Sequence, residues 1–128
     1  MKAILDAHAL LWFLAGDDRL SSTAKSAILT PANELWVSAA TLWEIAIKVS
    51  LGKLELAQPL AQLLPDQLER NAVGLLAIRL EHLVMVAELP FHHRDPFDRL
   101  MVAQALVDQL VVVSNDAALD AYGITRTW

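Results

Sequence analysis

Hydrophobic residues follow two patterns along the chain. Short continuous apolar runs, typical of buried strands, are separated by longer stretches in which apolar residues recur at helical spacing. The runs predict strands at 3–5, 35–37, 75–78 and 110–113, with a last edge strand at 124–126. Because strands that alternate with helices are joined by right-handed crossovers, this order predicts a parallel sheet with helices on both faces.

Helices are predicted between the strands, and capping or stop residues give most of their limits. The expected helices are one that begins at Leu10 and stops at Gly16, 23–29 capped by Ser21, one opened by Thr41 and Glu44 as a capping box and stopped at Gly52, 60–64 and 66–72 on either side of Pro65, 81–89 before Pro90, one that begins at Pro96, and 117–122 before Gly123. The fold class is therefore α/β, with three layers and a central parallel sheet of four to five strands. We expect residues 1–128 to form one domain.

Length and composition narrow the classes of protein further. The chain has 128 residues, of which 55% are hydrophobic, more than the roughly 45–50% of a typical soluble domain. This surplus predicts low solubility of the isolated chain and association with itself or with a partner. No apolar run approaches the roughly 18 residues of a membrane span, and Asp6 and His8 interrupt the apolar start, so we expect no membrane anchor and no export signal. The lack of cysteine excludes disulfides and zinc–thiolate sites and fits a cytoplasmic protein.

Four carboxylates are predicted to meet at one edge of the sheet. Asp6 ends the first strand and Asp116 follows the fourth. Glu44 lies in the first helical turn after the second strand, and Asp98 lies at the start of the helix before the fourth. In an open parallel sheet, a ligand site lies beyond the carboxyl ends of the strands, where helices begin. The expectation for Asp98 requires its helix to point its N-terminus toward this edge.

Such a cluster needs protons or cations to balance its charge. Two carboxylates about 4 Å apart repel by ~4 kcal/mol at an effective dielectric constant near 20, and four carboxylates make several such pairs. Oxygen ligands without cysteine favour Mg²⁺ or Mn²⁺ over zinc. Such an ion can lower the pKa of a bound water and stabilise charge on a phosphoryl oxygen, which suits phosphodiester hydrolysis.

The net charge of −5 argues against a protein that coats nucleic acid, since phosphate affinity comes from basic patches. It does not exclude a nuclease. Of the 15 acidic residues four belong to the predicted cluster, and the remaining 11 nearly balance the 10 basic residues. The surface outside the cluster is therefore expected to be close to neutral.

Several segments carry a family resemblance. They are Asp6 after a buried strand, Val37–Lys48 with Ser38 and Glu44, His93–Arg99 followed by Ala103–Ala105, and Val113–Asp116. In this order, over nearly the whole chain, they resemble the PIN-domain nucleases and most of all the VapC-like toxins of toxin–antitoxin pairs. The stretch 54–72 carries no motif of the family.

The resemblance implies a metal-dependent endoribonuclease whose acidic quartet is Asp6, Glu44, Asp98 and Asp116. It also implies that Ser114 is a supporting hydroxyl. RNA would be the substrate, a cognate antitoxin would plug the groove, and the chain would form a homodimer.

Some of these residues also have a structural interpretation. Glu44 is either a metal ligand or the partner of Thr41 in a capping box and of Lys48 four residues on. Asp116 is either a ligand or a helix cap. Asp95 is expected to cap the helix that begins at Pro96 and to lie near the site.

Basic residues near the site are expected in supporting positions. Arg99, like Arg94, is expected either to hold substrate phosphates or to pair with Asp95 or Asp98. The three histidines near the predicted site are expected to be loop or supporting residues and not ligands: His8, His92 and His93.

Two other functions remain open from the sequence. An acidic-pocket phosphatase or phosphoacceptor domain also places Asp at strand ends. It usually needs a second acid beside the first and a late lysine, whereas Ala7 and His8 follow Asp6 and no lysine occurs after Lys53. The other alternative is a non-enzymatic α/β module whose groove only binds a protein.

Overall fold

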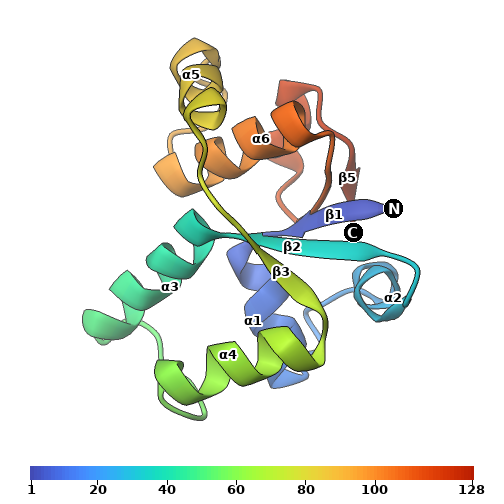
Figure 1. Cartoon of the computed structure of the whole chain (residues 1–128), viewed down its shortest axis with the longest axis vertical. Coiled ribbons are helices and arrows are strands. Elements are labelled where there is room, and N and C mark those ends of the chain that lie inside the picture. The colour runs from blue at the N-terminus through green and yellow to red at the C-terminus, as the bar shows by residue number, and fades with distance from the viewer.

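Five parallel strands form the middle layer of the structure, a computed structural model that describes residues 1–128 (Figure 1). The strands are β1 (Lys2–Leu5), β2 (Glu34–Ser38), β3 (Val73–Leu76), β4 (Val111–Val113) and β5 (Arg126–Thr127). Their order across the sheet is β3-β2-β1-β4-β5. At the centre, Ile4 of β1 pairs with Trp36 of β2 and with Val112 of β4. The predicted parallel sheet of four to five strands is confirmed.

Helices cover both faces of this sheet (Figure 1). In that view α1 to α4 lie below the strands, and α5 and α6 lie above them. The helices are α1 (Ala7–Ala15), α2 (Ser22–Leu29), α3 (Ala39–Ser50), α4 (Leu60–Arg70), α5 (Leu80–Glu88), α6 (Pro96–Asp108) and the 3₁₀ helix η1 (Ala117–Tyr122). The predicted three-layer arrangement is therefore confirmed. None of the helices combines the length and the apolar character that crossing a membrane requires.

The central strand β1 divides its side chains between the two layers. Ala3 and Leu5 belong to the core that includes α1 and α2, and Ile4 belongs to the core on the α6 side. This alternation follows from the two-residue period of a strand. All three side chains are fully buried. Because β1 is covered on both faces up to its last residue, Asp6 is the first polar group to emerge at the sheet edge.

α1 begins earlier than predicted. The expected start was Leu10, but the helix begins at Ala7. The cause is Asp6, whose Oδ1 accepts a hydrogen bond from the Ala9 N–H at 2.7 Å and so caps the first turn. The apolar pattern alone gave no sign of this turn, because Ala7 and His8 lie on its more exposed side.

α3 is also capped by the residue that ends the preceding strand. The helix begins at Ala39, and the Ser38 hydroxyl accepts a hydrogen bond from the Ala40 N–H at 3.1 Å. The predicted capping box of Thr41 and Glu44 is therefore wrong, since both residues lie inside the helix. Ser38 can satisfy the free N–H groups of the first turn, so Glu44 is left available for another role.

α4 is a single helix, whereas two short helices were predicted on either side of Pro65. The helix runs through Pro65 without interruption. A proline there removes one hydrogen bond, the one to the carbonyl of Ala61. Ala61 is exposed, so water can satisfy that carbonyl. Leu60 and Leu68, one on each side of Pro65, both pack against the core that includes Val73 of β3, which keeps the two halves together.

The limits of β3 and β5 differ from the predicted limits by one or two residues. The apolar run was expected to pair as far as Ile78, but β3 ends at Leu76, which pairs with Ser38, the last residue of β2. Ile78 is exposed and lies in the connection to α5. A strand stops where its neighbour stops, and the hydrophobic pattern does not record that limit.

Candidate metal centre

Two of the four predicted carboxylates lie where central strands end. Asp6 follows β1, and its N–H donates to the carbonyl of Val113 in β4 at 3.1 Å. Asp116 follows β4, and its Oδ1 accepts from the Ala118 N–H at 3.1 Å, which caps η1. Because β1 and β4 are neighbours in the sheet, both carboxylates come to the same edge.

α3 and α6 supply the other two carboxylates. Glu44 lies in the second turn of α3 and Asp98 lies in the first turn of α6. The two helices pack together through Trp43 and Phe97, whose rings meet edge to face at 5.5 Å between centroids. Each aromatic ring adjoins one of the acids in sequence, so this contact brings Glu44 and Asp98 toward each other. The N-terminus of α6 thus points toward the predicted edge.

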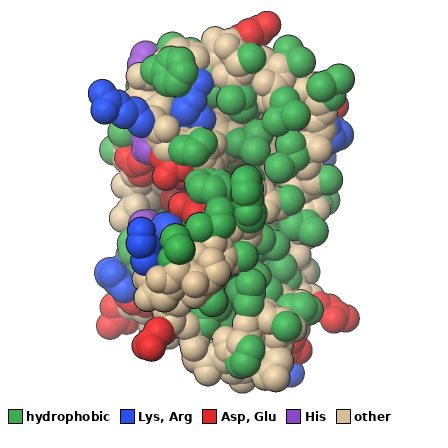
Figure 2. Space-filling view, turned by 90° about the vertical axis from the view of Figure 1, so that its left-hand side faces the viewer, with side chains coloured by type: hydrophobic (Ala, Val, Ile, Leu, Met, Phe, Trp, Pro, Cys, Tyr) green, Lys and Arg blue, Asp and Glu red, His purple; other side chains and the backbone are tan.

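The four carboxylates line one hollow of about 420 Å³. The other residues around it are Ala7, His8, Lys48, Asp95 and Asn115. Figure 2 shows acidic side chains and histidines gathered in a depression on one side of the molecule, with basic side chains at its margin. Lys48 is the lysine of this hollow, and its Nζ lies 3.2 Å from Glu44 Oε2. The structure therefore brings together residues from four separate segments of the chain.

The pKa values of two of these acids reflect burial and crowding. The pKa of Asp98 is raised to about 7, first by burial and next by the charge of Asp95, with smaller contributions from Glu44 and Asp6, while His93 acts in the opposite direction. Burial also raises the pKa of Asp6, and Asp116 adds to this, although the Ser114 hydroxyl and the helix cap oppose it. Burial is thus the first cause of both shifts, and for Asp98 the neighbouring carboxylates add to it.

Ser114 lies buried beneath the acidic hollow, between the end of β4 and the start of η1. Its hydroxyl accepts a hydrogen bond from the Asp116 N–H at 3.1 Å, and it lies near enough to Asp6 to lower the pKa of that acid. Ser114 thus contacts two of the four acids, and its supporting role remains a prediction.

Asp95 has the position expected from the sequence. Its Oδ1 accepts hydrogen bonds from the N–H groups of Phe97 and Asp98, at 2.8 and 3.1 Å, and so caps α6. It also lines the hollow and raises the pKa of Asp98. Asp95 therefore fixes the first turn of α6, which carries Asp98.

Arg99 does not line the hollow, and the expectation that it binds phosphate or pairs with Asp95 or Asp98 is corrected. Its side chain is buried, and its guanidinium donates to the carbonyls of Val86, Leu89 and Pro90 at the end of α5. Carbonyls at the end of a helix lack their full set of intrahelical partners, so they attract the cation, although the Val86 carbonyl also accepts from the Leu89 N–H at 3.2 Å. Arg99 also donates to the Tyr122 hydroxyl at 3.1 Å. It supports the site only indirectly, through Tyr122.

His93 lies closer to the acids than a loop residue was expected to lie. Its Nε2 is 2.9 Å from Asp116 Oδ2 and 3.5 Å from Asp98 Oδ2. Ligand atoms of these three residues lie within 4.8 Å of one another, close enough to surround a metal ion. The sequence signal for this placement was weak. It consisted of a histidine two residues before the helix cap Asp95, a spacing at which the ring can fold back onto the backbone.

The residues present fit a divalent cation. Asp6, Glu44, Asp98 and Asp116 offer carboxylate oxygens, which are the ligands that Mg²⁺ and Mn²⁺ prefer. Burial raises the pKa of Asp6 and of Asp98, and a cation bound beside them would favour their ionised forms.

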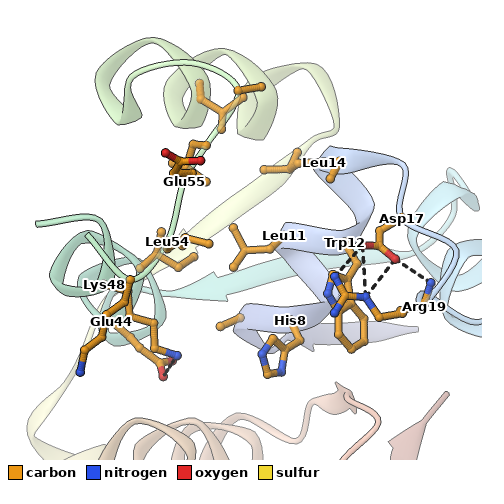
Figure 3. Close-up of a pocket in the computed structure, with 17 residues that line it drawn as sticks. His8, Leu11, Trp12, Leu14, Asp17, Arg19, Glu44, Lys48, Leu54 and Glu55 are labelled. Carbon is orange, nitrogen blue, oxygen red and sulfur yellow. Dashed lines mark hydrogen bonds and ion pairs between the residues drawn. The ribbon is translucent and has the colours of Figure 1, made fainter. Parts of the chain in front are cut away.

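A second, larger hollow of about 480 Å³ adjoins the acidic one. Figure 3 shows it as a groove between α1 and the segment that leads to α4, with Leu11 and Trp12 on one side and Leu54 on the other. His8, Glu44 and Lys48 lie at the end that opens onto the acidic hollow, and they line both spaces. An apolar groove therefore leads directly to the carboxylates.

Comparison with known proteins adds to this geometry. Residues 3–124 match the PIN domain. The chain is 30% identical over 121 residues to "Ribonuclease VapC22" of Mycobacterium tuberculosis, an alignment that covers 93% of this chain and 90% of that protein.

Solved structures resemble the fold. The VapBC2 structure from Rickettsia felis, bound to a DNA fragment from its promoter, has a TM-score of 0.73 at 13% identity, over 98% of this chain and 97% of that one. VapBC-1 from nontypeable Haemophilus influenzae has a TM-score of 0.62 at 17% identity, over 98% and 96%. With residues 3–124 matched, and with the fold and the resemblance noted in the sequence in agreement, the chain belongs to the PIN-domain family.

Proposed function

We propose that this chain is a metal-dependent endoribonuclease and the toxin of a toxin–antitoxin pair. The observation that carries the proposal is the meeting of Asp6, Glu44, Asp98 and Asp116 in one hollow at the carboxyl edge of the sheet. Membership of the PIN-domain family and the similarity to a ribonuclease support RNA as the substrate. We also propose that the protein acts in the cytoplasm.

Asp6, Asp98 and Asp116 would hold a Mg²⁺ or Mn²⁺ ion, with Glu44 as a further ligand or as the group that orients water. When bound, the ion activates water and stabilises negative charge on the phosphoryl oxygens. Glu44 is suited to orient water because it is largely buried and its Oε2 is already directed by Lys48 at 3.2 Å. Asp6 and Asp116 are held rigidly as helix caps, which keeps their remaining lone pairs directed into the hollow.

The groove beside the hollow is suited to a segment of an antitoxin. The structural neighbours are VapBC structures, so a partner of this kind is a reasonable proposal for this chain. The groove offers Leu11, Trp12 and Leu54 to apolar side chains. At its acidic end, a basic side chain of the partner would meet the carboxylates. Such a segment would block access to the metal centre.

A homodimer is the second proposed assembly. Large hydrophobic side chains are exposed on β3, on α5 and on the connection between them: Leu75, Ile78, Leu80, Leu83 and Val84. Figure 2 shows a broad band of hydrophobic side chains beside the acidic depression. Exposed apolar surface of this extent marks an interaction site in many proteins. Sedimentation of the full chain, alone and co-expressed with its partner, would separate a monomer from a dimer and from a complex.

The substitution Asp6→Asn tests the proposed activity without disturbing the fold. Asparagine caps a helix as well as aspartate does, so the bond from the Ala9 N–H is kept while the charge is lost. We expect cleavage of end-labelled RNA with Mg²⁺ or Mn²⁺ to fall by at least about 100-fold, since the ion stabilises the transition state by several kcal/mol.

Asp66→Asn is the matched control. Asp66 is exposed on α4 and pairs with Arg70 at 2.9 Å, far along the chain from the hollow, and its loss should leave cleavage unchanged. A folded Asp6→Asn protein that cleaves RNA at nearly the wild-type rate would defeat the proposal.

A further inference from the structure

The ring of His93 is held from three directions. Its Nδ1 accepts a hydrogen bond from the Asp95 N–H at 3.1 Å. Its Nε2 faces Asp116 Oδ2 at 2.9 Å, with Asp98 Oδ2 farther away at 3.5 Å. The backbone N–H of His93 donates to the Tyr122 hydroxyl at 2.9 Å, which holds this part of the loop between α5 and α6. Neither the ring nor its backbone is free to turn without breaking one of these bonds.

These contacts determine which ring nitrogen carries the proton. A nitrogen that accepts a hydrogen bond has no hydrogen of its own, so the bond from Asp95 leaves Nδ1 bare. The neutral ring then carries its hydrogen on Nε2, and that N–H points at the Asp116 carboxylate. A metal ligand must present a bare nitrogen, and here the nitrogen that faces the acids is the protonated one.

The same contacts fix the orientation of Asp116. Its Oδ1 accepts from the Ala118 N–H at 3.1 Å and its Oδ2 accepts from His93. Its backbone N–H donates to Ser114. Each carboxylate oxygen has two lone pairs, so one on each oxygen remains for a cation. The carboxylate is therefore oriented before any ion arrives.

We propose that His93 is a positioning residue of the metal centre, which donates from Nε2 to Asp116 and does not itself bind the ion. The proposal rests on the proposed metal-dependent function. It also has a consequence for the choice of metal, because a centre with oxygen ligands alone favours Mg²⁺ or Mn²⁺, whereas a bound imidazole would shift the preference toward later transition metals.

Spectroscopy of the full chain tests the role of the ring directly. With histidine labelled by ¹⁵N, NMR of the metal-free and Mg²⁺-loaded protein should show Nδ1 bare and Nε2 protonated at His93 in both states. Pulsed EPR of the Mn²⁺-loaded protein should show no coupling of the size that a directly bound nitrogen gives. A proton on Nδ1, or a strong nitrogen coupling that is lost in His93→Leu, would overturn the proposal.

Variants test the hydrogen bond. His93→Leu removes the donor, and we expect the affinity for Mn²⁺, measured by calorimetry, to fall by about 10–100-fold, as is typical when a partner of a metal ligand is lost. His93→Gln keeps an N–H near the position of Nε2 and should recover most of the affinity. If both variants bind as the wild type does, or if glutamine rescues nothing, the positioning role is wrong.

His92→Ala is the matched control. It removes the neighbouring exposed histidine, whose ring only touches the edge of Tyr122, and should leave the affinity unchanged. Asp98→Asn separates the two proposals. If it abolishes Mn²⁺ binding while His93→Leu does not alter it, the metal centre stands and the positioning role fails. If the wild-type protein binds no Mn²⁺, the proposed function fails first.

Discussion

Two histidine–aspartate clusters lie on the α6 side of the molecule, and they treat their carboxylates in opposite ways. At the C-terminal end of α6, buried His82 faces Asp108 at 3.0 Å, and Arg79 donates to the same carboxylate. Burial acts to raise the pKa of Asp108, but Arg79 and His82 outweigh it, so that pKa is lowered. At the N-terminal end, His93 faces Asp116 and Asp98 without an arginine, and the pKa of Asp98 is raised to about 7.

The difference separates a structural cluster from a candidate site. The charge of Asp108 is balanced within the fold, so it fastens α5 to α6 and needs nothing further. The acids around Asp98 are not balanced, and their repulsion is a cost of the folded state that a bound cation would relieve. The pairing of a histidine with an aspartate does not by itself distinguish the two clusters. The distinction lies in Arg79, which neutralises Asp108 and has no counterpart beside Asp98.

The largest difference is expected in metal binding. Asp98→Asn should lower the affinity for Mn²⁺ by more than the ~10–100-fold that loss of a supporting hydrogen bond costs, because it removes a charged ligand. Asp108→Asn should leave the affinity unchanged. Isothermal titration calorimetry of both variants measures the contrast, and equal losses in the two variants would show that the affinity does not depend on the acidic hollow.

The free energy of unfolding should depend more on Asp108 than on Asp98, which is the reverse of the order expected for metal affinity. Asp108→Ala removes the partner of the buried His82 Nε2 and one of the two carboxylates that pair with Arg79, and we expect it to lower the free energy of unfolding by about 1–3 kcal/mol. Asp98→Asn removes repulsion and should leave the metal-free protein at least as stable at pH 8. Urea unfolding without metal measures both. A destabilised Asp98→Asn protein would contradict the charge imbalance proposed for the hollow.

The third difference concerns the pH dependence of stability. The pKa of Asp98 is about 7 in the folded protein and near its ordinary value of 3.8 in the unfolded chain. The folded state therefore binds the proton more strongly, and Asp98 should make the metal-free protein less stable as pH rises from about 4 to about 7. Asp98→Asn should flatten this decline in thermal unfolding curves. An unchanged slope in the variant would mean that Asp98 does not titrate in this range.

The sequence was sufficient to predict the sheet and the positions of the acids, because buried parallel strands are apolar runs and the acids lie where those runs end. It was not sufficient to predict caps and helix continuity. Ser38, not Thr41, caps α3, because the hydroxyl of this last residue of β2 accepts a hydrogen bond from the Ala40 N–H in the first turn of the helix. α4 continues through Pro65 because packing elsewhere compensates for one lost hydrogen bond.

The site residues were predicted to different degrees for a related reason. Asp6 directly follows β1 and Asp116 lies three residues after β4, so topology alone places them. Arg99 and His93 depend on the path of the loop between α5 and α6, where side chains bond to backbone groups distant in sequence. The Arg99 side chain points toward the end of α5, and the His93 side chain points toward the acids. The hydrophobic pattern does not specify these side-chain directions.

Asp6 and Asp116 cap helices with the same carboxylates that face the hollow, and asparagine would cap them equally well. Aspartate and asparagine codons differ by one base. For a chain proposed to be toxic, a single-base change in either codon would give an inactive protein that still folds and still binds the antitoxin. Such inactive variants should arise readily wherever the active protein slows the growth of the cell that makes it.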